Sequence, residues 1–178
     1  MSADYSKLSG ILDPVLKSVD FSKTNEEGVN AGLPDGYYLC QVEKAELTES
    51  KSGNPMVVIE FMTIEDGKKA EVGEDGYSKL VTVRNTANKK IFCNYVLTNE
   101  MNIGFFVSDM LKFQDPETNE PLFPKTRFET TKGIIEVCED LTAGGVIYLM
   151  LQTIEKDGKP DQKKRPISWK RASRLELI

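Results

Sequence analysis

The fold is decided by two apolar stretches and the polar turn between them, YYLCQVEKAEL (37–47), TESKSGNP (48–55) and MVVIEFMTI (56–64). In the last stretch Val57, Ile59 and Phe61 fall on one face, which is the period of a half-buried strand. The middle stretch contains Ser, Gly, Asn and Pro, which favour turns. These residues predict two antiparallel strands joined by a turn that carries Lys51.

Outward from this pair, the chain alternates between strand and helix patterns. Apolar residues with period two predict strands, whereas the i, i+3, i+4 spacing of Ile103, Phe106 and Val107 predicts a helix that Thr98 can cap. Residues 66–76 are polar and predict a long loop. The remaining predicted elements are strands at 77–83 and 89–97, a second helix at 131–141, a buried strand at 146–154, a turn at 156–164 and a last strand at 167–172.

This order of elements predicts a mainly β fold with one or two helices. A five-stranded OB barrel has a helix between its third and fourth strands, and the chain matches that order. We expect an OB-fold domain at residues 33–178 and an N-terminal appendage and linker at 1–32. Within the appendage, Asp13 and Pro14 predict an N-cap and the first residue of a short helix at 14–19. Its apolar stripe predicts either a cover for an open barrel end or a homodimer contact.

Composition excludes much chemistry. The chain has 178 residues, no histidine and three cysteines, and these cysteines lie far apart in apolar stretches. Without imidazole there is no Ser-His-Asp triad, and the cysteine spacing matches no zinc site. We expect buried structural cysteines in a reducing compartment, no metal and no cofactor. No carboxylate or lysine lies in a recognisable catalytic constellation, so we expect no enzyme activity.

Charge is distributed unevenly along the chain. The net charge is −5, yet residues 156–174 contain eight basic residues against two acidic ones, a local charge of +6. The residues before position 156 contain 15 basic and 25 acidic residues, a charge of −10. A positive end on a negative body predicts a localised surface for a polyanionic partner.

In an OB barrel the ligand surface is the face of strands two and three with its two flanking loops. The basic residues of this chain cluster in those predicted loops. Single-strand binding needs cations for phosphates and exposed rings for bases. The predicted phosphate contacts are Lys51, Lys89, Lys90, Lys156, Lys159, Lys163, Lys164, Arg165 and Lys170, and the stacking candidates are Phe92, Tyr95 and Trp169.

Each of these candidates has a structural alternative. Phe92 and Tyr95 are three positions apart and face opposite sides of a straight strand, so at least one belongs to the core; we favour Phe92 there. Trp169, placed on the last strand, serves equally well as a core residue. A lysine-rich hairpin also protects a strand edge from aggregation.

Four short motifs add a resemblance: VDFSK (19–23), LPDGY (33–37), VEKAE (42–46) and SKSGNPM (50–56). With these motifs the chain resembles a family of phage-encoded OB-fold single-stranded DNA-binding proteins. The likeness recurs between Leu141 and Trp169 but leaves residues 115–125 unexplained. It implies sequence-independent binding of single-stranded DNA in phage replication or recombination, beside a recombinase, helicase or polymerase.

Two hypotheses about function follow from the sequence. The first is a single-stranded DNA-binding protein in the cytoplasm of the bacterial host, with no membrane association, because no signal peptide or long apolar run is present. The alternative is a non-catalytic β-barrel adaptor or virion component, whose basic hairpin docks an acidic protein.

Overall fold

The computed structural model describes residues 5–17, 24–25, 28–29 and 32–178. The chain divides into two compact units, Met1–Gly32 and Leu33–Ile178. The elements described in the first unit are helix α1 (Tyr5–Lys17) and the paired short strands β1 (Thr24–Asn25) and β2 (Gly28–Val29).

Helix α1 differs from the helix predicted at residues 14–19. It begins at Tyr5, so Asp13 is not its N-cap, and Pro14 lies inside it. Pro14 has no N–H to donate to the carbonyl of Gly10, yet the helix continues to Lys17. The prediction was wrong because it treated the proline as a helix start, whereas α1 tolerates the missing bond. Residues 18 and 19 lie outside the described residues.

The second unit is built on an antiparallel sheet of seven strands. Its central strand pairs with a neighbour on each side, giving the order β7-β4-β3-β8-β9. The predicted mainly β class is confirmed, and four of the predicted strands lie close to their predicted bounds: β3 (Gly36–Glu49), β4 (Pro55–Thr63), β7 (Lys90–Val96) and β8 (Val146–Lys156). Strand β9 (Lys159–Ile167) lies mostly where the sequence predicted a turn at 156–164.

The sheet is open. Among the described strands, β7 pairs only with β4 and β9 pairs only with β8, so no backbone ladder joins these two edges. The backbone pairing therefore gives an open sheet where the sequence predicted a closed barrel. We call the gap between β7 and β9 the seam.

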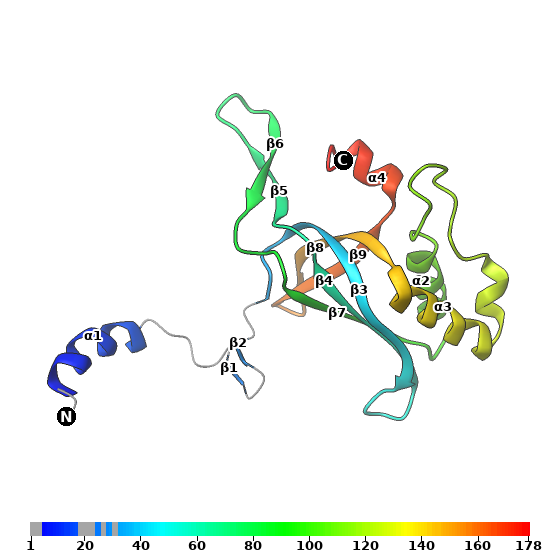
Figure 1. The fold of residues 1–178 in the computed structure, drawn as a ribbon, viewed down its shortest axis with the longest axis horizontal. Coiled ribbons are helices and arrows are strands. Elements are labelled where there is room, and N and C mark those ends of the chain that lie inside the picture. Colours follow the sequence, from blue (N-terminus) through cyan, green and yellow to red (C-terminus); the bar gives the residue numbers. More distant parts are fainter. Residues whose placement is uncertain (1–4, 18–23, 26–27, 30–31) are drawn as a thin grey trace. The chain divides into compact units, whose positions relative to one another are not determined.

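A hairpin begins inside the loop that was predicted at residues 66–76. It consists of β5 (Gly67–Val72) and β6 (Ser78–Val83), and it joins the rest of the sheet through the pairing of Tyr37 with Lys68. Figure 1 shows this hairpin projecting from the sheet. The strand predicted at 77–83 is β6. Strand β5 was missed because most of its side chains are exposed on both faces, so it lacks apolar alternation.

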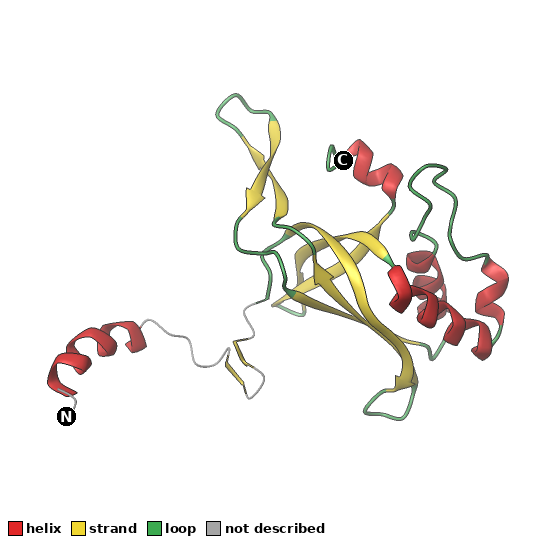
Figure 2. Cartoon of the chain, in the orientation of Figure 1, coloured by secondary structure: helices red, strands yellow, loops and turns green. Residues whose placement is uncertain are grey.

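Helices fill the connection between β7 and β8 (Figure 2). They are α2 (Glu100–Met110), the 3-10 helix η2 (Lys125–Glu129) and α3 (Thr131–Gly144). The N-cap of α2 is Asn99 and not Thr98, because the Asn99 side chain accepts the backbone N–H of Asn102 at 2.9 Å. Thr130 caps α3 in the same way through Gly133, at 3.0 Å.

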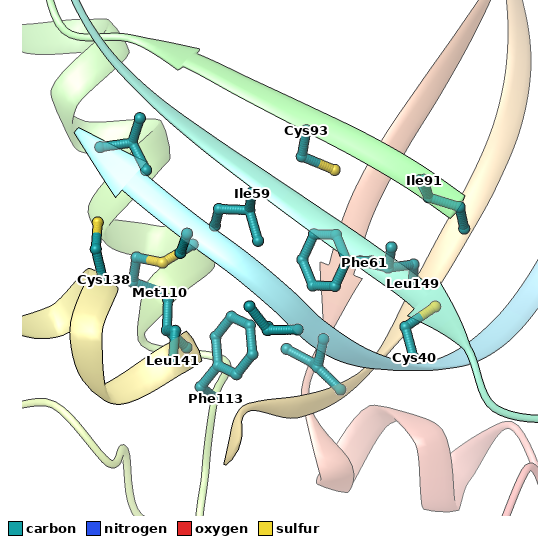
Figure 3. Packing of buried hydrophobic residues seen from close by; sticks show 14 of the residues in the cluster. Cys40, Ile59, Phe61, Ile91, Cys93, Met110, Phe113, Cys138, Leu141 and Leu149 are labelled. Carbon is teal, nitrogen blue, oxygen red and sulfur yellow. The ribbon is translucent and has the colours of Figure 1, made fainter. Parts of the chain in front are cut away.

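The main core lies between the sheet and these helices. Figure 3 shows Met110, Phe113 and Leu141 from the helical side beside Ile59 and Phe61 from β4. The three cysteines are free and buried, which confirms the predicted structural role. Burial raises the pKa of the Cys93 thiol to about 12 and that of Cys138 to about 11, so these thiols stay protonated near neutral pH.

The chain ends in a helix where the sequence predicted a strand at 167–172. Helix α4 (Trp169–Arg174) begins after Ser168, whose hydroxyl accepts the N–H of Arg171 at 3.3 Å. A second, smaller core holds α4 against β8 and β9, and it consists of Tyr148, Ile167, Ala172 and Leu177. The alternation of Ile167 and Trp169 suggested a strand. In the structure, Trp169 and Ala172 are three residues apart on a helix, and both pack in this second core.

Candidate nucleic-acid interface

The two aromatic residues of β7 point to opposite sides, as the sequence predicted, but in the reverse assignment. Phe92 is on the outer face and its side chain is 47% exposed. The Tyr95 ring packs on Phe106, with ring centroids 5.3 Å apart, and its hydroxyl donates to Asp109 Oδ2 at 3.0 Å. Burial raises the pKa of Tyr95 well above 10. Phe92 is thus the exposed ring, and Tyr95 serves the core.

Phe92 lies on a face formed by the outward side chains of β4 and β7. Glu60 is directly opposite Phe92, and Val58 and Met62 lie on either side of Glu60 along β4. These β4 side chains are half-buried, so they form a partly apolar floor beside the exposed ring. We call this surface the β4–β7 face.

The charges of the β4–β7 face neutralise one another. Lys90 Nζ lies 2.5 Å from Glu60 Oε1, and Lys44 Nζ lies 3.0 Å from Glu46 Oε2 on the adjoining strand. The hydrogen bond that Lys90 donates to the Glu60 carboxylate raises the pKa of Lys90. Lys90 was predicted as a phosphate contact, and the structure places it in an ion pair that a phosphate would have to replace. The sequence could not reveal this pair because it depends on strand register.

Lys164 bridges the seam. Its Nζ donates to the carbonyl oxygen of Phe92 at 3.1 Å, so β9 meets β7 through a side chain and not through a backbone ladder. Lys164 lies opposite the buried Leu151 and so on the core side of β9, but Lys164 itself is exposed. A phosphate bound by Lys164, as the sequence predicted, would have to replace this bond. The same bond places β9 beside the exposed ring of Phe92.

The neighbours of Lys164 face outward and bring positive charge to the seam. Lys163 bonds Asp161 at 2.8 Å, and this bond lowers the pKa of Asp161. Arg165 has no ion pair in the described part of the chain. It lies opposite Met150, whose sulfur accepts from Arg171 Nη2 at 3.8 Å, so the two arginines flank one methionine.

Helix α4 extends this positive surface. Lys170, Arg171 and Arg174 are exposed, and none of them pairs with a carboxylate within the described ranges. Arg171 and Arg174 were not among the predicted contacts. The signal that could have found them is Ser168, a residue type favoured as a helix N-cap. We define the cationic strip as Lys163, Arg165, Lys170, Arg171 and Arg174.

The other predicted cations lie away from the strip. Because β8 runs antiparallel to β3, the turn with Lys51 and the tip of the β8–β9 hairpin lie beyond opposite ends of β3. Lys156 and Lys159 are directly opposite each other at that tip. The hairpin turn itself is only Asp157 and Gly158, both with positive φ, so most of the predicted basic turn at 156–164 is strand. Lys89 is exposed just before β7.

Trp169 is not on the sheet. Its indole N–H donates to the carbonyl of Gln114 at 2.9 Å, and its ring meets Tyr148 edge-on at 5.9 Å. The half-buried ring lines a pocket of about 290 Å³ beside α4. Stacking on the sheet by Trp169, as first predicted, does not agree with this placement.

No protein-family model matches the chain, and a search of curated proteins gives no significant match. In the ranges that the structure describes, no cluster of metal-ligating side chains is present. None of the described helices combines the length and apolarity needed to cross a membrane.

Proposed function

We propose that the protein binds single-stranded DNA without sequence preference and without catalysing a reaction. The DNA runs across the seam, with a base stacked on Phe92 and the adjoining phosphates bound by the cationic strip. The observation that carries this proposal is the hydrogen bond from Lys164 to the Phe92 carbonyl, because it sets the exposed ring of β7 beside the positively charged outer side of β9. Rings and cations in this combination suit a flexible polyanion with planar bases.

The strand order supports an OB-type arrangement as part of this proposal. In an OB barrel the first strand pairs with the second and fourth, and a helix precedes the fourth. Strands β3, β4, β7, β8 and β9 follow this order, with α2 and α3 before β8. We infer that Lys164 takes the place of the ladder that closes such barrels. The resemblance of the motifs at 19–56 supports a role in phage replication or recombination in the host cytoplasm.

The proposal is tested by fluorescence anisotropy of a labelled oligo-dT. Replacing Phe92 with Ala should weaken binding about 5- to 150-fold, because stacking of a base on one ring contributes about 1–3 kcal/mol. Phe92 is exposed, so the variant should fold. The control is Tyr77→Ala, since Tyr77 is 76% exposed on the projecting β5–β6 hairpin and away from the seam. Equal affinities of both variants and the unmodified protein would contradict the proposal.

A second candidate function is docking of a partner protein. Helix α2 carries the side chains of Met101 and Phe105, which are 68% and 62% exposed and lie one turn apart. Exposed apolar residues in a group favour a protein contact. An acidic partner protein whose binding is unaffected by competing oligonucleotide would support this adaptor function in place of DNA binding.

A further inference from the structure

The pocket beside Trp169 is separate from the β4–β7 face. Its volume is about 290 Å³, and it lies between α4 and the segment that follows α2. This segment belongs to the stretch 115–125, which the sequence resemblance leaves unexplained. The residues that matter for its chemistry are Pro116, Asn119, Trp169, Lys170, Ser173 and Arg174.

The walls of this pocket are held by internal hydrogen bonds. Asp115 Oδ1 accepts the backbone N–H groups of Glu117 and Thr118 at 2.8 and 3.0 Å, and these bonds lower the pKa of Asp115. The N–H of Asn119 donates to the Asp115 carbonyl at 2.8 Å. On the other wall, the bond from Trp169 to Gln114 fixes the indole. The pocket is therefore formed before any ligand enters, which lowers the entropic cost of binding.

The groups that line the pocket select for a ligand with both an anionic group and a flat ring. Lys170 and Arg174 are one helical turn apart, and neither has a carboxylate partner in the described part of the chain. The indole offers a surface for a planar group, and Ser173 and Asn119 offer polar contacts. An acidic peptide would satisfy the two cations but would leave the indole without a planar partner.

We propose that this pocket binds one nucleotide of single-stranded DNA, with its base against Trp169 and its phosphate on Lys170 and Arg174. This inference rests on the proposed function and adds a second base site to it. Lys164 at the seam and Trp169 are five residues apart, so at about 3.3 Å per residue the two sites lie within about 17 Å. A single strand of about 4–16 nucleotides, the site size of one OB fold, spans that distance.

Trp169 is the single tryptophan of the chain and provides a specific probe. Unlabelled oligo-dT is titrated into the full-length protein while tryptophan emission is recorded, and anisotropy of a labelled oligo-dT measures total binding. Emission should change with the same midpoint as anisotropy. In Arg174→Ala, the slope of log affinity against log salt should fall by about 0.7, the value for one phosphate contact. Arg84→Ala, an exposed arginine directly after β6, is the matched control and should keep the slope of the unmodified protein.

The two proposals fail in different ways. If oligo-dT produces no change in anisotropy, the proposed function itself is wrong. If anisotropy shows binding but the emission of Trp169 is unchanged, only the pocket site is overturned. If Arg174→Ala keeps the slope of Arg84→Ala, both the pocket site and the place of Arg174 in the cationic strip are overturned. Stronger quenching by poly-glutamate than by oligo-dT would also overturn the pocket site and would assign the pocket to an acidic protein.

Discussion

At the scale of single residues, adjacent lysines on β9 have different roles. Lys163 is half-buried and bonds the Asp161 carboxylate, whereas Lys164 is exposed and bonds a backbone carbonyl of another strand. From the sequence both belonged to one basic cluster. A phosphate would have to replace a different partner at each lysine: a carboxylate at Lys163 and a backbone carbonyl at Lys164.

This difference predicts that alanine substitution lowers the stability of the protein at Lys164 but changes it little at Lys163. Lys164→Ala should lower the free energy of unfolding by about 1 kcal/mol, because one hydrogen bond across the seam is lost. Lys163→Ala should change stability little, because exposed ion pairs contribute little. Urea denaturation measures both. A larger loss for Lys163→Ala would show that Lys164 does not hold the seam.

At the scale of elements, the N-cap of α2 is Asn99 in the structure, whereas the sequence suggested Thr98. Asn99→Ala should cost about 1 kcal/mol of stability, since the N–H of Asn102 would lose its acceptor. Thr98→Ala is the control, because the Thr98 hydroxyl accepts only a long side-chain bond of 3.4 Å. Thermal or urea unfolding of the two variants decides between the caps, and an equal loss would contradict the assignment to Asn99.

The elements that the sequence predicted well are those with one buried face. In β4, Val57, Ile59 and Phe61 are fully buried, and the alternation that predicted the strand is the alternation of its burial. Strand β5 and helix α4 give the opposite case. Strand β5 is exposed on both faces over most of its length, and α4 is a six-residue helix whose apolar residues also fit a strand.

The candidate site was predictable in composition but not in arrangement. A cluster of cations near the carboxyl end and an exposed ring on β7 were both expected. The ion pair of Lys90 with Glu60 and the hydrogen bond from Lys164 to the Phe92 carbonyl are long-range features that no local pattern contains. The contribution of Arg171 and Arg174 depended on recognising a short helix.

At the scale of the whole molecule, a buried threonine ties several elements together. The hydroxyl of Thr86 donates to the Val83 carbonyl at 2.6 Å and accepts the N–H of Gly67 at 2.8 Å. The carboxylate of Asp66 accepts the N–H groups of Thr86 and Ala87 at 2.8 and 3.0 Å. These bonds connect the start of β5 with the segment that leads into β7, so they help hold the seam strand in place.

This network predicts a pH dependence of stability. The backbone hydrogen bonds lower the pKa of Asp66 below 3.8, so the charged carboxylate stabilises the folded chain above that pH, and the contribution is lost as the pH falls through the folded pKa. Asp66→Asn should therefore be less stable than the unmodified protein at pH 7, and the difference should shrink below pH 3.8. Urea unfolding across this range measures it, and a constant difference would contradict the role of the charge.

Charge is also arranged at this scale. The chain as a whole is acidic, with a net charge of −5, while Lys163 is the one residue of the cationic strip that bonds a carboxylate of the described ranges. If about five phosphates are bound there, affinity should fall about a hundredfold between 50 and 200 mM salt. Anisotropy of labelled oligo-dT at several salt concentrations gives this slope. A slope near zero would indicate contacts other than phosphates.

The most direct test is to follow the backbone amide resonances of the protein by NMR while oligo-dT is added. If DNA crosses the seam, the largest shifts should occur around Phe92 on β7, around Arg165 on β9 and along α4. Shifts confined to α2 or to the β3–β4 turn, or no shifts at saturating oligonucleotide, would contradict the account.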